Sequence, residues 1–211
     1  MARRTQKDAE ATRERILASA LDLFLEKGYA RTTFDDVAKP LAMTKGAVFW
    51  HFDSKEALLL ALVGRAITSI CDMMREALPE DRAALTFQDV AASMVNIAVH
   101  ICENVEMRKF FLLVRTQVRW QEGSMAAVRE EILSDKTFGP KQAFMIALEN
   151  DRRNGRIRAD VDAQQVMHIA LAIWDGLLAE KIDGFLEADL ATTISNAYKA
   201  AWETIRFKEQ T

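Results

Sequence analysis

The sequence predicts an all-α protein of about nine to ten helices. Only three prolines and eight glycines interrupt its 211 residues, and apolar residues recur at helical spacing almost from end to end. Half of the residues are hydrophobic and 28% are charged, which is typical of a folded chain with a sizeable core rather than of a disordered one. The prediction is a small three-helix head followed by a larger helical body.

The first helix is expected over about residues 7–27. Gly28 follows it at the position where glycine ends many helices in a left-handed conformation. Tyr29 comes next, where a hydrophobic residue commonly packs back on the last turn, here on Phe24. These residues therefore predict a sharp, well-defined helix end.

Two short helices and a long one follow. Thr33 is a good N-cap for the second helix, which should end near Lys39 because Pro40 disfavours a helical predecessor. Thr44 caps a third, very short helix, and Ser54 caps a long fourth one. Two short capped helices separated by about four residues form a helix-turn-helix pattern.

The rest of the chain continues in helices. "TFQD" at 86–89 is a variant of the capping box and should open a helix reaching about Asn104. We expect two domains, residues 1–54 and residues 55–211. The remaining helices of the second domain are expected over 106–120, 124–134, 138–154, 162–182 and 187–207.

The charge is unevenly distributed along the chain. Residues 1–55 carry ten Lys/Arg and eight Asp/Glu, a net +2, whereas residues 56–211 carry eighteen and twenty-three, a net −5. A basic end on an acidic protein weakly indicates a polyanionic partner. The longest apolar run, residues 57–63, is far shorter than the roughly 18 residues of a membrane span, and "MARRTQKDAE" has no secretory apolar segment. We expect a cytoplasmic protein that does not contact a membrane.

The sequence lacks the motifs of catalysis. Cys71 and Cys102 are isolated thiols, which we interpret as core residues. His51, His100 and His168 do not have metal-ligand spacing. The nucleophile elbow, the Walker A loop and the glycine-rich dinucleotide motif are also missing. We therefore expect no enzymatic activity, no metal and no cofactor.

The stretch "MTKGAVFWHF", residues 43–52, predicts a DNA-reading helix. Val48 and Phe52 lie one turn apart and should face inward, while Lys45 and Phe49 share an outward face. The glycine and alanine between them leave room for close approach to a groove, and no obvious partner for Lys45 lies on its helix. A cation followed by small residues and rings suits a helix in the major groove.

Residues 10–60 resemble the DNA-binding domain of the TetR family of transcriptional regulators, and within it most the AcrR-like branch of multidrug-efflux repressors. The resemblance lies in "LFLEKGYARTT" and "TKGAVFWHFDSKEAL". Beyond residue 60 it rests on helix order and length. It implies a dimeric, ligand-responsive regulator, most often a repressor that binds a palindromic double-stranded DNA operator and is released by a small hydrophobic effector.

The resemblance also implies which residues contact DNA. Thr33 should bond a phosphate, and Lys45 should read guanine, while Ala47 should touch a thymine methyl. Trp50 and Phe49 can instead be packing residues. An arm containing Arg3, Arg4 and Lys7 can reach a neighbouring groove or serve only as a solubilising tail. The expected DNA-contacting residues are Thr33, Thr44, Lys45, Ala47, Phe49, Trp50, His51 and Lys55.

Three positions depart from the family pattern. Phe49 stands where tyrosine is usual, so a hydroxyl contact to phosphate should be lost. Ala42 replaces the usual glycine of the turn, and Pro40 should kink or shorten the second helix. We expect a slightly altered turn with intact DNA binding. These departures, with the modest charge of the head, leave one alternative: a small-molecule-binding helical protein whose head mediates protein–protein contacts.

The body carries the dimer and pocket expected from the resemblance. The last two helices should form an isologous four-helix bundle, although their apolar stripes can instead face their own core. The expected interface residues are Ile169, Ile173, Trp174, Leu177, Ile194, Ala197 and Ala201. Large apolar side chains should surround an effector pocket, or else form plain core. The expected pocket residues are Ile67, Cys71, Phe111, Arg115, Trp120, Phe144 and Leu148.

Overall fold

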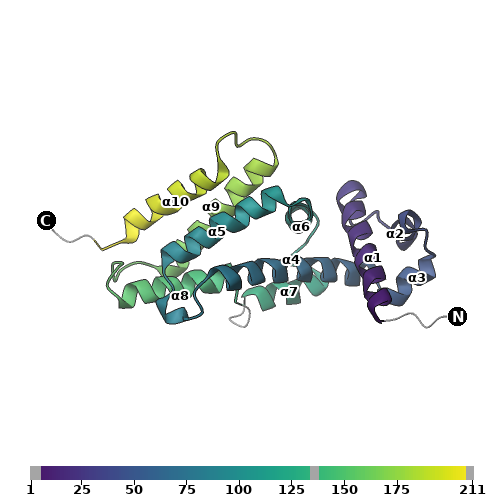
Figure 1. Cartoon of the computed structure of the whole chain (residues 1–211), viewed down its shortest axis with the longest axis horizontal. Helices are drawn as coiled ribbons and strands as arrows, with labels where there is room; N and C mark the ends of the chain where they lie inside the picture. Colours follow the sequence, from purple (N-terminus) through teal and green to yellow (C-terminus); the bar gives the residue numbers. More distant parts are fainter. Residues whose placement is uncertain (1–5, 134–137, 208–211) are drawn as a thin grey trace. The chain divides into compact units, whose positions relative to one another are not determined.

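The computed structural model describes residues 6–133 and 138–207 (Figure 1). Over these residues the chain is helical, which confirms the predicted all-α class. Arg3 and Arg4 lie outside the described residues. The helices are α1 (Gln6–Lys27), α2 (Phe34–Ala38), α3 (Lys45–His51), α4 (Lys55–Ala77), α5 (Phe87–Glu103), α6 (Val105–Thr116), α7 (Gly123–Leu133), α8 (Pro140–Arg153), α9 (Ala163–Ile182) and α10 (Leu190–Ile205), with 3₁₀ turns η1 (Lys39–Leu41) and η2 (Arg82–Ala84).

The chain divides into two compact units. The head unit comprises Met1–Ile67 together with Glu106–Arg129, and the body unit comprises Thr68–Val105 together with Glu130–Thr211. Helix α4 contributes residues to both units. The head unit thus contains α6 and the start of α7 besides the three N-terminal helices. The predicted boundary between a DNA-binding domain, residues 1–54, and a second domain, residues 55–211, concerns function and remains a prediction.

The head forms around α1 and confirms the expected helix ends. Gly28 has a φ of 85°, in the left-handed region, and the Tyr29 ring centroid lies 5.2 Å from that of Phe24. The Ser19 hydroxyl donates to the carbonyl of Val37 over 3.1 Å and so ties α1 to α2. The buried face of α1 consists of Thr12, Ile16, Leu17, Ala20, Leu21, Leu23 and Phe24.

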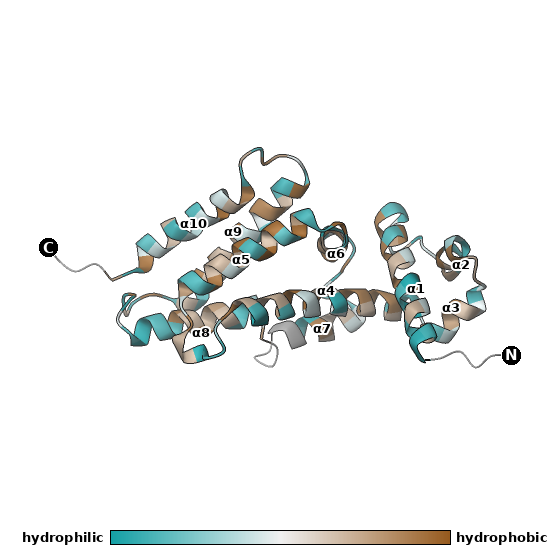
Figure 2. Ribbon diagram, in the orientation of Figure 1, coloured by the Kyte–Doolittle hydropathy of each residue, from teal (hydrophilic) through white to brown (hydrophobic). Residues whose placement is uncertain are grey.

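Helix α4 is hydrophobic over much of its length (Figure 2). Among the described helices it alone is long and apolar enough to cross a membrane, a test that core helices of soluble proteins also pass. Leu62 and Val63 are at most 1% exposed in the folded chain. Arg65, near the middle of the helix, pairs with Glu14 and with Glu106. Buried leucines beside a paired arginine are typical of a core helix.

The body unit is built on α5, α8, α9 and α10, which pack in adjacent pairs. The rings of Phe87, Phe144 and Tyr198 meet with centroids 5.7–6.2 Å apart, within the range of favourable aromatic contacts. Asp151 of α8 is fully buried, and its Oδ2 accepts from the backbone N–H of Phe87 over 2.9 Å. Arg156 Nε lies 2.7 Å from its other oxygen. A buried carboxylate therefore joins the start of α5 to α8.

Candidate nucleic-acid interface

Helix α3 has a buried side and an exposed side, as the sequence predicts. Val48 is fully buried and Phe52, just after the helix, is 4% exposed, and both share the head core with Val37. The Thr44 hydroxyl accepts from the backbone N–H of Ala47 over 3.2 Å, so Thr44 is the predicted N-cap. Packing on one side and capping at the start fix the orientation of this seven-residue helix.

The exposed side of α3 carries a cation and two aromatic rings. Lys45 is exposed, with Nζ 5.9 Å from the Phe49 ring centroid. Phe49 is 46% exposed, and one edge of it packs on Phe34 at a centroid distance of 4.5 Å, so it both packs and remains accessible. Trp50 is 71% exposed and touches His51 rather than the core, which excludes the interpretation of Trp50 as a core anchor.

Lys45 has a partner that sequence inspection did not find. Its Nζ lies 3.4 Å from Oδ2 of Asp35, and both side chains are more than half exposed. The partner lies on α2, so spacing within α3 alone cannot reveal it. Exposed pairs of this kind contribute little stability, and the ammonium group remains able to exchange the carboxylate for another acceptor.

The turn between α2 and α3 accommodates both unusual residues. Helix α2 ends at Ala38, and Pro40 sits at the start of η1, so the proline does shorten the helix. Ala42 adopts φ 53° and ψ 37°, a left-handed conformation that costs a non-glycine residue about 1–2 kcal/mol. Its N–H still donates to the carbonyl of Lys39 over 3.2 Å. The turn is closed despite the alanine.

Thr33 is occupied by its own helix. Its hydroxyl accepts from the Asp36 N–H, and its own backbone N–H donates to Asp36 Oδ2 over 2.9 Å, which completes a capping box. The hydroxyl also donates to the same Asp36 oxygen over 2.6 Å. Hydrogen bonds from Lys27 and Thr33 hold the pKa of Asp36 well below its ordinary value. Asp36 is therefore ionised near neutral pH, and a phosphate bound by Thr33 has to share the hydroxyl with this carboxylate.

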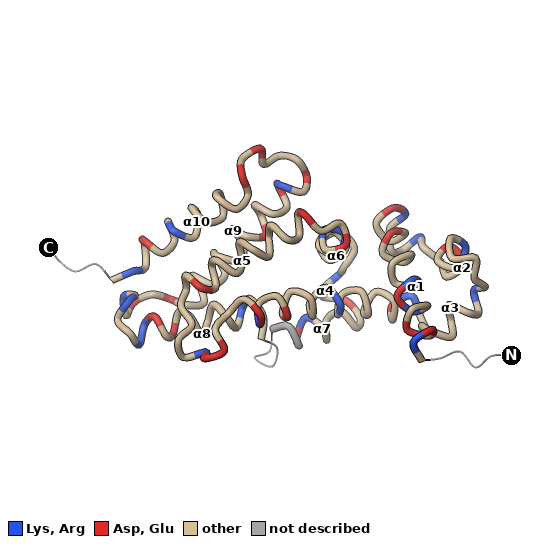
Figure 3. The backbone as a smooth tube through the Cα atoms, in the orientation of Figure 1, with Lys and Arg blue, Asp and Glu red and all other residues tan. Residues whose placement is uncertain are grey.

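A hollow of about 250 Å³ opens where α2, α3 and α4 begin. Lys55 lies on its wall, with Nζ donating to the carbonyls of Tyr29 and Ala30 over 2.7 and 2.9 Å. These bonds hold one ammonium group beside the hollow, while Lys45 brings a second. Figure 3 shows acidic as well as basic positions along α1 to α3, so the head as a whole is not uniformly basic. The hollow is lined by Thr32, Thr33, Phe34, Lys45, Phe49, Ser54 and Lys55.

Comparison with known proteins places this head in a family. Residues 16–62 match the family described as bacterial regulatory proteins, tetR family. The HTH-type transcriptional regulator TtgR of Pseudomonas putida is 26% identical over 182 residues, which are 84% of this chain and 83% of TtgR. AcrR of Shigella flexneri is 43% identical over 58 residues, 28% of this chain and 27% of AcrR. Residues 16–62 therefore form a TetR-family domain. The TetR-family relatives are transcriptional regulators and not enzymes, which confirms both the recognised family and the expected lack of enzymatic activity.

Solved TetR-family structures share the whole fold. SmeT, the repressor of the Stenotrophomonas maltophilia multidrug efflux pump SmeDEF, superposes with a TM-score of 0.73 at 24% identity, covering 96% of this chain and 94% of SmeT. A complex of SmeT with triclosan gives a TM-score of 0.75 at 24% identity, with coverage of 94% and 93%. At this identity the likeness establishes the fold of the body as well as of the head.

The residues expected to line a TetR-family effector pocket are divided between the two units. Ile67, Phe111, Arg115 and Trp120 belong to the head unit, and Cys71, Phe144 and Leu148 to the body unit. Phe144 and Leu148 are fully buried, and burial raises the pKa of the Cys71 thiol. None of the seven lines the hollow beside α3, and Phe144 and Leu148 behave as core residues. Their assignment to an effector pocket remains a prediction.

The residues expected at a TetR-family dimer interface differ in exposure. Ile169 is 47% exposed, whereas Ile194 is fully buried within its own chain. The indole N–H of Trp174 donates to the carbonyl of Met94 over 2.7 Å, which ties α9 to α5. Ile194 and Trp174 therefore have structural partners in the same body unit. The intermediate positions are Ile173, Leu177, Ala197 and Ala201, which remain partly accessible.

Proposed function

We propose that the protein is a homodimeric repressor that binds a palindromic DNA operator through α3 and is released by a small hydrophobic effector. The observation that carries the DNA part is the two-sided α3, with Val48 buried and Lys45, Phe49 and Trp50 exposed. An exposed cation and rings on a helix whose opposite side is fixed in the core suit insertion into a major groove.

The proposed contacts follow from this geometry. Lys45 exchanges Asp35 for guanine O6 or N7, and Ala47 approaches a thymine methyl. Lys55, already held by two backbone carbonyls, presents charge to a phosphate beside the hollow. His51 and Trp50 meet the backbone at the rim of the groove. Thr33 and Thr44 contribute mainly by capping, which orients the helices that carry the other contacts.

Dimerisation through α9 and α10 presents two heads to one duplex. Support comes from the exposed side of these helices, where Ile169 lies with the partly accessible Ile173 and with small residues. Small residues permit close helix approach, as an isologous four-helix interface requires. Helix-turn-helix dimers read half-sites about one helical turn, roughly 34–36 Å, or a multiple of it apart. We place the protein in the cytoplasm, where such DNA is available.

The effector and the target genes are proposed from relatives. SmeT represses a multidrug efflux pump and forms a complex with triclosan. By analogy, we infer that this chain regulates efflux genes, that residues 1–54 bind DNA and that residues 55–211 bind the effector and the second subunit. An effector that binds the DNA-free state more tightly must weaken the binding of DNA. By the same factor, bound DNA must weaken the binding of the effector.

A gel shift against the intergenic DNA upstream of its own gene tests this function. Lys45→Ala should weaken specific binding by about 5- to 150-fold, since a good base contact contributes roughly 1–3 kcal/mol. Lys39→Ala is the matched control, because Lys39 is an exposed lysine of the neighbouring turn. Repeating the assay at two salt concentrations measures the phosphate contacts. Equal binding by the wild type and Lys45→Ala at both concentrations would contradict the assigned role of α3.

A further inference from the structure

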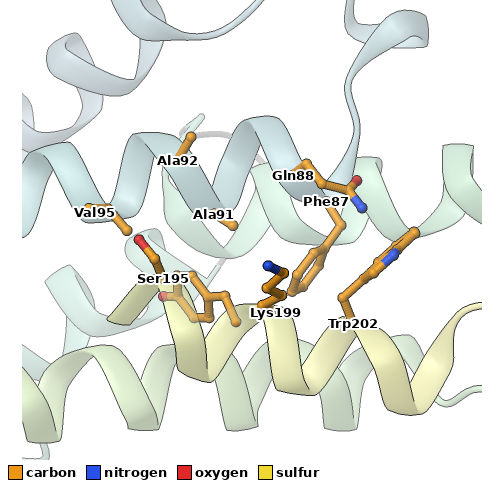
Figure 4. A pocket seen from close by; sticks show the side chains of 9 residues that line it. Phe87, Gln88, Ala91, Ala92, Val95, Ser195, Lys199 and Trp202 are labelled. Atoms are coloured by element: carbon orange, nitrogen blue, oxygen red, sulfur yellow. The ribbon is translucent and has the colours of Figure 1, made fainter. Parts of the chain in front are cut away.

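The body unit contains a groove on the outer side of α5 and α10. It encloses about 220 Å³ and is lined by Phe87, Gln88, Ala91, Ala92, Val95, Ser195, Tyr198, Lys199 and Trp202. Figure 4 shows side chains from the two helices facing one another across it. None of these residues is among those expected in an effector pocket or at the dimer interface, so the groove is separate from both.

One wall of the groove is aromatic. The Trp202 and Phe87 rings stack with centroids 5.6 Å apart and an interplanar angle of 22°. Phe87 is buried, whereas Trp202 remains partly exposed, so the outer ring of the stack faces the groove. Ala91 on α5 points toward α10 and leaves space between the two helices (Figure 4). A flat ring can continue the stack, and such contacts are favourable beyond simple burial.

The polar groups at the rim are mainly hydrogen-bond donors. Within the described ranges, no hydrogen bond or ion pair engages Nζ of Lys199, the Gln88 amide, the Ser195 hydroxyl or the Trp202 indole N–H. The acidic residues near them are already engaged: Glu203 with Arg206 over 2.7 Å and Asp89 with Thr86 over 2.7 Å. Lys199 lies between the aromatic wall and Ser195 (Figure 4). The rim therefore offers a positive charge and several free donors, which together favour an anionic acceptor.

We propose that this groove binds a flat aromatic carboxylate, with the ring stacked on Trp202 and the carboxylate held by Lys199. Charge-assisted hydrogen bonds are the stronger kind, and the apolar walls reduce the competition from water. The groove is on the flank of α10 formed by Ser195, Lys199 and Trp202, whereas Ala197 and Ala201 are on another flank at helical spacing. A dimer built on Ala197 and Ala201 leaves the groove open.

Calorimetric titration of the full-length protein with 2-naphthoate tests the proposal. No DNA is present, so the result does not depend on the proposed repressor function, and a failed gel shift leaves it unaffected. Lys199→Met should weaken binding about tenfold, while Lys199→Arg should stay within about threefold of the wild type. The neutral isostere 2-naphthamide should bind at least about tenfold more weakly than 2-naphthoate.

A second pair of variants tests the location. Ala91→Phe fills the groove from a partly exposed position on α5 and should abolish binding. Ala84→Phe, at an exposed alanine of η2 outside the groove, should leave binding unchanged. Circular dichroism confirms that each variant is folded. The proposal is overturned if the wild type does not bind 2-naphthoate, if Lys199→Met changes the Kd less than about threefold, or if folded Ala91→Phe binds as the wild type does.

Discussion

In the head unit, polar side chains secure the ends of short helices, whereas in the body unit the most deeply buried polar group joins two long helices. Thr33 and Thr44 bond residues three positions further along the chain. Asp151 bonds Phe87, which is 64 positions away. The two kinds of contact differ in range: the caps fix the short helices of the head locally, whereas Asp151 joins distant segments of the body.

Individual aromatic residues of the two units differ strongly in exposure. Phe49 and Trp50 of the head are 46% and 71% exposed, so their rings are available to a partner. Phe87, Phe144 and Tyr198 of the body are at most 2% exposed and form its core. Aromatic content alone therefore does not locate a binding site; an exposed ring beside a cation, as at Lys45 or Lys199, is the more informative sign.

Removing the buried carboxylate should give the largest effect on stability. Asp151→Ala leaves the Phe87 N–H unpaired in the body core and should lower the free energy of unfolding by about 1–3 kcal/mol. Burial raises the pKa of Asp151. The carboxyl group of Asp151 thus stays protonated to a higher pH in the folded chain than in the unfolded chain, where the pKa of an aspartate is about 3.9. The stabilisation from Asp151 is greatest below that pH and decreases as the pH rises through the folded pKa.

Urea unfolding at several pH values measures this effect. The difference between the wild type and Asp151→Ala should shrink from about pH 4 to about pH 8, in line with the raised pKa. Asp160→Ala is the control, since Asp160 is exposed and pairs with nearby Arg158, and it should cost less than about 0.5 kcal/mol. A difference that grows with pH would contradict the assigned direction of the pKa shift.

Relieving the left-handed alanine should stabilise the head. Ala42→Gly removes about 1–2 kcal/mol of backbone strain from the folded state. Glycine also raises the entropy of the unfolded state, which lowers the stability by about 0.4–1 kcal/mol. The expected net gain is about 0.5–1 kcal/mol, detectable as slower hydrogen exchange in α2 and α3. Ala47→Gly, within a regular helix, should instead lose about 0.5–1 kcal/mol. The strain assigned to Ala42 is refuted if Ala42→Gly and Ala47→Gly change the stability in the same direction.

The smallest effect should come from the carboxylate beside the DNA-reading lysine. Asp35→Asn frees Lys45 and removes a negative charge from the proposed interface, and should raise affinity for non-specific duplex DNA about two- to fivefold. Fluorescence anisotropy with a random duplex measures this change. Asp53→Asn removes the same charge from another exposed position in the head. Equal effects of the two variants would show that only net charge matters and that the Asp35–Lys45 pair does not.

The helices and the two-sided α3 were predictable because caps, glycines and apolar spacing act over a few residues. Thr33, Gly28 and Val48 all occupy the conformations that their local sequence favours. Contacts between elements were not predictable in this way. The Gln117 side chain accepts from the N–H of Tyr29, 88 positions earlier in the chain, and the Asp35–Lys45 pair depends on the angle between two helices.

The outer groove was missed for the same reason. Trp202 and Phe87 are far apart in the sequence, and their stacking follows from the packing of α10 on α5. The sequence signal that remains is modest: small residues at Ala91 and Ala92, next to one another on a helix whose other side is large and apolar. Such a pattern becomes informative only when the facing helix is known.

Selection of duplexes from a random pool by the wild-type protein tests the central claim most directly. The account predicts enrichment of an inverted repeat whose half-site centres lie about one helical turn, or a multiple of it, apart. It also predicts that Lys45→Ala fails to enrich the same bases, while Lys39→Ala enriches them. Enrichment of no sequence by the wild type, or of a single unpaired half-site, would contradict a dimer that reads DNA through α3.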